Sequence, residues 1–279
     1  MTFVLDLHEE RCTITRGCDR IEPSGQCRVQ APQPGWSPFF VIASCARTED
    51  NVNAEHLVAS VRSVQLFHPS SDILVVENCR GGGEQPKLAE RLRQFDRVAL
   101  RTNPQSLFEM GAFALGIHHM LFNNSSGIHK YSHLVLLQHT TRLAGPLKPS
   151  PCPTLLFTPW QFMGGHDGYP PSIQVSNFVP TGMYAHLAKR GILPNGWCDK
   201  YTDTWISATH GVLLIDRLRA KLLLDMGLLD VELISMCARR FCWESLSGLY
   251  VSYLSFLQPE CGGIHVHPST VKVHGNTHR

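Results

Sequence analysis

Short apolar runs, each bounded by polar residues or by Gly and Pro, divide the chain into regular pieces. An apolar run of four to eight residues is typical of a strand that is buried on both faces. We therefore predict strands at residues 39–44, 73–77, 97–101, 133–137, 154–158 and 211–215. A shorter strand is expected near the start of the chain, at residues 3–7.

Helical patterns lie between these strands. Leu57, Val61 and Val64 share one face of a helix that Asn51 or Asn53 would cap. Further helices are expected at residues 86–95, 108–121, 217–229, where Asp216 would be the cap, and 241–257. The 108–121 helix is apolar nearly all round, so we expect it to be buried, with Gly and Ala positions that allow close approach of a neighbour.

This alternation predicts an α/β fold. A strand, a helix and a strand within some forty residues form a right-handed crossover, which makes the strands parallel. We expect one domain with a mostly parallel central sheet flanked by helices, over residues 38–258. Residues 1–37 read as an irregular N-terminal arm rich in Pro and Gly, and residues 259–279 as a tail.

Composition excludes several classes of function. The chain has 279 residues, 43% hydrophobic and 17% charged, with a net charge of +2. A net charge this small gives no strong positive electrostatic field of the kind that attracts nucleic acid. No run approaches the roughly 20 apolar residues that span a bilayer. The acidic N-terminus lacks a basic signal-peptide region, so a cytoplasmic location is expected.

Ten cysteines are present, and none forms a Cys-x-x-Cys pair. We expect reduced thiols, buried where Cys45, Cys79 and Cys242 lie in or beside apolar segments. A zinc site combining Cys12, Cys18 and Cys27 with a distant His is the alternative.

Polar residues follow several of the predicted strands, where open α/β sheets bind ligands. The strand at 133–137 ends in Gln138, His139 and Thr140. The strands at 39–44 and 73–77 end in Ser44 and in Glu77 and Asn78. No Gly-x-Gly-x-x-Gly follows the first strand, which argues against a Rossmann-type dehydrogenase or methyltransferase.

This order of strands, with the Glu-x-Gly-Ala helix at 109–112 before the Leu-Val-Leu-Leu-Gln-His-Thr stretch, resembles the nucleotide-sugar half of GT-A fold glycosyltransferases. The resemblance spans roughly residues 38–257. It implies a Rossmann-related, GT-A-like fold and a hexosyl- or pentosyltransferase that uses a nucleotide-diphosphate sugar. The donor-binding residues it implies are Ser44, Arg47, Glu77, Asn78, Gly111, Gln138, His139 and Thr140.

The chain departs from that family at the Asp-x-Asp motif, whose carboxylates hold a divalent metal. Gln138, His139 and Thr140 stand there instead, and Mg²⁺ prefers carboxylate oxygens. His139 alone would give Mn²⁺ a single protein ligand. Three alternatives stay open. Cations would replace the metal; Mn²⁺ or Mg²⁺ would take ligands from elsewhere; or catalysis has been lost and binding kept. The candidate cations are Arg47, Lys130 and Arg142. The candidate metal ligands from elsewhere are His166 and Asp167.

The acceptor side is expected in the second half of the chain. Glu244, near the start of the last predicted helix and after Trp243, resembles the carboxylate that takes the proton of the acceptor hydroxyl in inverting GT-A enzymes. Trp160 and Asp167 lie in a long loop at 159–194, where aromatic rings would pack on a sugar. His210 precedes the strand at 211–215. The acceptor would be a glycan, a protein or a small molecule, and the rival function is a catalytically inactive sugar- or protein-binding module.

Overall fold

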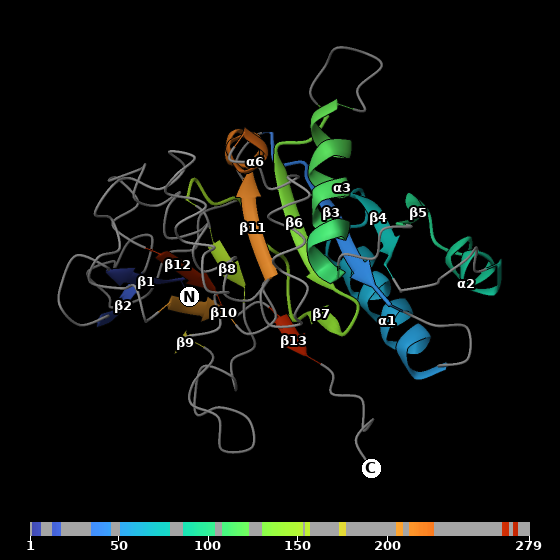
Figure 1. Cartoon of the computed structure of the whole chain (residues 1–279), viewed down its shortest axis with the longest axis horizontal. Helices are drawn as coiled ribbons and strands as arrows, with labels where there is room; N and C mark the ends of the chain where they lie inside the picture. Colours follow the sequence, from blue (N-terminus) through green and yellow to red (C-terminus); the bar gives the residue numbers. More distant parts are fainter. Residues whose placement is uncertain are drawn as a thin grey trace.

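The computed structural model describes residues 2–6, 13–17, 35–45, 51–78, 86–103, 108–122, 130–152, 154–156, 173–176, 205–208, 212–225, 264–267 and 270–272. A nine-stranded mixed sheet forms the centre of this part of the chain (Figure 1), in the order β2-β1-β12-β8-β11-β6-β3-β4-β5. Its strands are β1 (Thr2–Asp6), β2 (Thr13–Gly17), β3 (Pro38–Ser44), β4 (Asp72–Glu77), β5 (Val98–Thr102), β6 (His133–Gln138), β8 (Thr154–Leu156), β11 (Val212–Asp216) and β12 (Ile264–His267).

One half of the sheet is parallel. Strands β5, β4, β3 and β6 are neighbours in that order, and every pair among these neighbours is parallel. Strand β11 then runs antiparallel to both β6 and β8. On the far side β12 pairs in parallel with β8 and antiparallel with β1. The predicted α/β class is confirmed, and the parallel half carries the predicted first four strands of the main domain.

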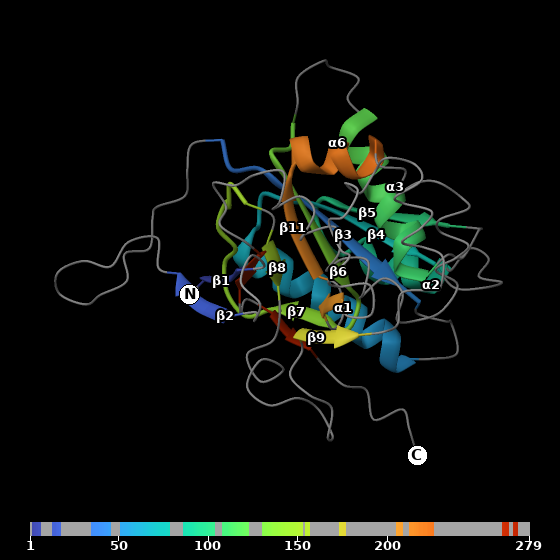
Figure 2. The ribbon, with the colours of Figure 1, turned by 60° about the vertical axis from the view of Figure 1, so that its left-hand side comes forward.

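Helices cover both faces of the sheet. Within the described residues these helices are α1 (Asn51–Phe67), α2 (Pro86–Leu92), α3 (Phe108–Phe122) and α6 (Arg217–Asp225). Figure 2 shows α3 and α6 above the sheet and α1 below it. Because successive strand residues point to opposite faces, each strand contributes to two cores.

The core on the α1 face is a cluster of buried apolar side chains. Phe40 and Ile42 of β3 meet Leu57, Val61 and Val64 of α1 there. All five side chains are fully buried. The helical spacing seen in the sequence is therefore the buried stripe of α1, and its opposite face carries exposed residues such as Leu66.

The core on the other face depends on close packing of α3. A Cβ atom on Gly116 would lie within 3.0 Å of three side-chain carbons of Val41. Phe113 and Ile117 of the same helix are fully buried. The predicted role of the small residues is confirmed at Gly116, where the neighbour is the β3 strand rather than a ligand.

Two small sheets add to the main one. Strand β7 (Thr141–Leu143) pairs with β13 (Thr270–Lys272), and β9 (Ile173–Ser176) pairs with β10 (Trp205–Ala208). The sequence did not predict these four strands. The expectation of an unbroken loop over 159–194 is wrong at β9, and strands β12 and β13 lie in the segment expected to be a tail.

The N-cap of α6 is confirmed. Asp216 Oδ1 accepts the backbone N–H of Arg219 at 2.9 Å, which satisfies an amide that the first helical turn leaves without a partner. Among the described residues, no helix is both long and apolar enough to cross a membrane.

The expectation of reduced thiols is wrong for Cys45. Cys45 and Cys152 each form a disulfide, and the partner cysteines lie outside the described residues. Disulfides are rare in cytosolic proteins and frequent in oxidising compartments. These bonds count against the predicted cytoplasmic location.

Candidate functional site

The parallel half of the sheet contains a topological switch point between β3 and β6. The chain proceeds from β3 outward through β4 to β5, and then crosses back to place β6 on the other side of β3. Open α/β sheets bind ligands outside the carboxyl ends of the strands at such a point. The predicted donor-binding residues at the ends of β3, β4 and β6 stand at this edge.

Strand register brings these ends together. Ser44 is the cross-strand partner of Glu77, and Ala43 is the partner of Gln138. Backbone bonds continue the ladder past the strands, from the Asn78 N–H to the Ser44 carbonyl at 2.8 Å and from the His139 N–H to the Ala43 carbonyl at 2.9 Å. The polar residues at the ends of β3, β4 and β6 therefore lie side by side at one edge of the sheet, as the sequence predicted.

Ser44 and Glu77 form a buried pair at the centre of the edge. The Ser44 hydroxyl donates to Glu77 Oε2 at 2.9 Å, and the two residues are 2% and 1% exposed. A carboxylate at this depth needs hydrogen-bond donors to offset its lost hydration. Ser44 supplies one such donor, which is a reason for a hydroxyl side chain at this position beside Glu77.

Asn78 continues the row toward β5. Its Oδ1 accepts a 2.6 Å hydrogen bond from Asn103 Nδ2, and both side chains are buried. The Asn103 N–H in turn donates to the Glu77 carbonyl at 2.8 Å. Asn103 was not predicted from the sequence, although it directly follows β5 as Asn78 directly follows β4.

Gln138 connects the edge to α3. Its Nε2 donates to Glu109 Oε1 in the first turn of the helix at 3.3 Å. Gly111 is buried two residues further along α3. The start of α3 is thus tied to the end of β6, where a helix N-terminus favours negative charge.

The turn after β6 presents the more accessible residues of this edge. His139 and Thr140 are partly exposed, in contrast to the buried Gln138. Thr141 and Arg142 follow in β7, and the buried Thr141 Oγ1 and Arg142 Nε have no hydrogen-bond partner in the part of the chain described. Arg142 therefore stays a candidate counter-charge.

Lys130 does not belong to this edge, and its candidacy as a counter-charge is wrong. Its ammonium pairs with Asp72, which also accepts from Arg97 at 2.9 Å and from the Tyr131 hydroxyl at 2.5 Å. Asp72 begins β4, whereas Glu77 ends it, so the two carboxylates lie roughly 17 Å apart along the strand. These neighbours lower the pKa of Asp72 in spite of its partial burial, which by itself would raise it.

The acceptor side of the predicted site lies outside the described residues. The proposed base Glu244 and its neighbour Trp243 are not among the described residues. The same holds for the loop residues Trp160 and Asp167, for His210 before the strand, and for the counter-charge Arg47. His166 lies outside as well. Their places opposite the donor stay predictions.

The described residues do not fit a divalent cation by themselves. No group of three or more His, Cys, Asp or Glu side chains able to hold a metal occurs among them. Gln138, His139 and Thr140 offer one imidazole and neutral oxygens, and the carboxylate of Glu77 is directed to Ser44. A metal at this edge would need ligands from the rest of the chain.

Comparison with known proteins gives likeness in structure alone. The chain matches no protein-family profile and no curated protein sequence. It is similar to the Mn/GDP form of core-mannan synthase A (CmsA/Ktr4) from Aspergillus fumigatus, at 9% identity and a TM-score of 0.45, over 80% of this chain and 71% of that one.

It is also similar to the mannosyltransferase Ktr4p from S. cerevisiae in complex with GDP, at 9% identity and a TM-score of 0.46, over 79% of this chain and 67% of that one. A second structure of Ktr4p gives the same identity and TM-score, over 78% and 67% of the two chains. Likeness at this level carries no argument about chemistry, so the site is judged on its own geometry. That geometry is a mixed α/β sheet whose switch point carries a row of buried polar pairs.

Proposed function

We propose that the chain is a glycosyltransferase, which moves a hexosyl or pentosyl group from a nucleotide-diphosphate donor to an acceptor hydroxyl. The observation that carries the proposal is the meeting of Ser44, Glu77 and Gln138 at the switch point between β3 and β6. Nucleotides bind at this place in doubly wound sheets. The GT-A resemblance of the same segments supports a sugar nucleotide over a nicotinamide cofactor.

The residues at the edge divide by accessibility. Ser44, Glu77 and Asn78 are buried and bonded to one another or to Asn103, so they would hold the floor of the donor site in one shape. His139 and Thr140 are the more accessible groups and would contact the donor. The amides at the start of α3 and the Arg142 guanidinium would meet its phosphates.

The simplest chemistry is a direct displacement with inversion, and retention remains the alternative. Glu244 would accept the proton of the acceptor hydroxyl while that oxygen bonds to the anomeric carbon. The bond between the anomeric carbon and the phosphate oxygen then breaks, and the nucleotide diphosphate leaves with the electron pair. Arg142, together with Arg47, would offset the charge that develops on this leaving group.

Incubation of the protein with a panel of nucleotide sugars, with and without Mn²⁺, tests this activity through nucleotide release. Calorimetry with the matching nucleotide diphosphate measures binding separately. Glu244→Gln should abolish release and leave nucleotide affinity unchanged. Glu90→Gln, at an exposed position of α2, is the matched control and should change neither. Normal turnover by Glu244→Gln would remove that residue from the mechanism.

A binding module without catalysis is the second candidate. The observation in its favour is Gln138–His139–Thr140 in place of the two metal-binding carboxylates. This function predicts nucleotide-sugar binding with no nucleotide release for any donor, with or without Mn²⁺. Release above the rate of the Glu244→Gln variant would exclude it.

A further inference from the structure

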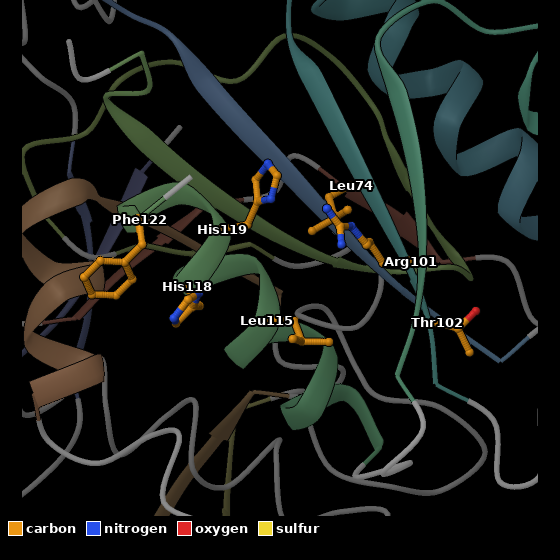
Figure 3. Close-up of a pocket in the computed structure, with 7 residues that line it drawn as sticks. All are labelled: Leu74, Arg101, Thr102, Leu115, His118, His119 and Phe122. Carbon is orange, nitrogen blue, oxygen red and sulfur yellow. The ribbon is translucent and has the colours of Figure 1, made fainter. Parts of the chain in front are cut away.

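A cavity of about 310 Å³ lies between α3 and the outer strands β4 and β5. Figure 3 shows its lining. Leu74 comes from β4, Arg101 and Thr102 come from β5, and the second half of α3 supplies Leu115, His118, His119 and Phe122. Strand β5 is the edge strand of the sheet, and α3 packs over β3, β4 and β6, so among the described elements the cavity lies between the second half of α3 and the outer strands β4 and β5.

The polar lining of this cavity is cationic. Among the described residues that line the cavity, Arg101 is the one fully charged side chain, and there is no carboxylate. Within the described residues Arg101 forms no ion pair, whereas Arg97 and Lys130 nearby share the single carboxylate of Asp72. The guanidinium reaches from β5 over Leu74 toward the helix (Figure 3), where two imidazoles stand.

The pKa of His119 is lowered, in part by the positive charges around it. Burial is the first cause that lowers its pKa, and the Arg101 guanidinium is the second. His118 and Lys130 lower it further, and only Asp72 acts in the opposite direction. The ring also stacks on Phe39 with centroids 5.3 Å apart, which holds it in place. A bound anion would relieve the repulsion among these groups.

The remaining lining is apolar and accessible. Leu115 is 41% exposed and Phe122 is 61% exposed, and both belong to α3. The Phe122 ring packs against His118 with centroids 4.7 Å apart. Large apolar side chains kept at the surface around a cavity are typical of ligand sites that combine an apolar wall with few polar groups.

We propose that this cavity binds a small organic anion, whose phosphate or carboxylate contacts Arg101 and whose aromatic or aliphatic body packs on Leu115 and Phe122. The planar fork of a guanidinium pairs with either group through two parallel hydrogen bonds. The volume is near the lower end for ligand pockets, roughly 300 Å³, and suits a one-ring compound. The proposal does not depend on the proposed glycosyltransferase function, since none of the described donor-site residues lines the cavity, although Thr102 ends β5 beside Glu77.

The test uses four probes with the full chain, namely phenyl phosphate, benzoate, inorganic phosphate and benzyl alcohol. Calorimetry gives their affinities, and saturation-transfer NMR shows which part of each probe touches the protein. Phenyl phosphate or benzoate should bind at least about tenfold more tightly than both inorganic phosphate and benzyl alcohol, because neither of these supplies both halves of the interaction. The order of phenyl phosphate and benzoate identifies the anionic group. Equal affinity for all four probes, or no binding, overturns the proposal.

Variants locate the binding. Arg101→Gln should weaken the preferred probe at least about tenfold, and Arg93→Gln, an exposed arginine after α2 that does not line the cavity, should not. Leu115→Glu places a carboxylate in the cavity from an exposed helical position and should abolish binding while the circular dichroism spectrum is kept. Undiminished affinity in Arg101→Gln and Leu115→Glu would place the anion elsewhere and refute the assignment.

Discussion

Ser44 and Glu77 end two neighbouring parallel strands, and the hydroxyl of the first donates to the carboxylate of the second at 2.9 Å in an almost fully buried setting. Because register makes them cross-strand partners, the bond fixes how the two strand ends face the switch point.

Loss of this bond should cost stability. Ser44→Ala leaves the buried carboxylate with one donor fewer, and we expect a decrease of about 1–3 kcal/mol in the free energy of unfolding. Urea denaturation measures it. Ser70→Ala, at an exposed turn, is the matched control and should stay within about 0.5 kcal/mol of the parent. A Ser44→Ala protein as stable as the parent would show that the pair does not support the edge.

Gly116 should resist enlargement. Gly116→Ala places a methyl group against Val41 and should destabilise the protein by about 1–3 kcal/mol, although alanine is the better helix former. Val41→Ala removes two of the three crowded carbons. The double variant should therefore be more stable than the sum of the two single changes predicts, as a double-mutant cycle measures. Additive effects would contradict the contact.

His68 should make stability depend on pH. It is 7% exposed, its Nε2 accepts the N–H of Leu147 at 2.9 Å, and burial lowers its pKa from 6.5 to about 4. The unfolded chain therefore takes up the proton first, so the free energy of unfolding should fall as pH decreases from about 6.5 to about 4.

His68→Gln keeps an acceptor for Leu147 but does not titrate, so chemical denaturation across this range should give a shallower slope. The slope should not vanish, because burial also lowers the pKa of His133. His118→Gln, at an exposed position of α3, serves as the comparison. An unchanged slope in His68→Gln would mean that His68 does not titrate as its surroundings require.

Cys45 and Cys152 should resist alkylation in the unreduced protein. Each forms a disulfide, so iodoacetamide should modify them only after reduction, as peptide mass spectrometry detects. The same digest, without reduction, identifies the partner cysteines. Loss of either bond should cost about 2–5 kcal/mol of stability. Modification of Cys45 without reductant would restore the expectation of a free thiol.

The parallel half of the sheet was predictable because each of its strands and helices has a hydrophobic pattern within its own short segment of sequence. An apolar run such as residues 133–137 needs burial on both faces, and the stripe of Leu57, Val61 and Val64 needs one covered face. Crossover handedness then orders the strands. The strand ends Ser44, Glu77 and Gln138 followed from that order.

Other features depend on contacts between distant segments. Strands β7 and β13 have three residues each, too few for a periodic pattern. Lys130 is adjacent to a predicted strand, but only the fold shows that it meets Asp72 at the amino end. Asn103 was missed because a single polar residue after an exposed edge strand carries little signal until its bond to Asn78 is seen.

The pairing of Phe3 with Val266 in β1 and β12 has a consequence for biosynthesis. As the polypeptide leaves the ribosome, β3, β4 and β6 can associate early, whereas β1 cannot pair with β12 until residues 264–267 have been translated. Until then β1 keeps unsatisfied backbone groups along its β12 side, which are a template for intermolecular pairing. A nascent chain arrested before residue 264 should be prone to aggregate, and translation of β12 should suppress the aggregation.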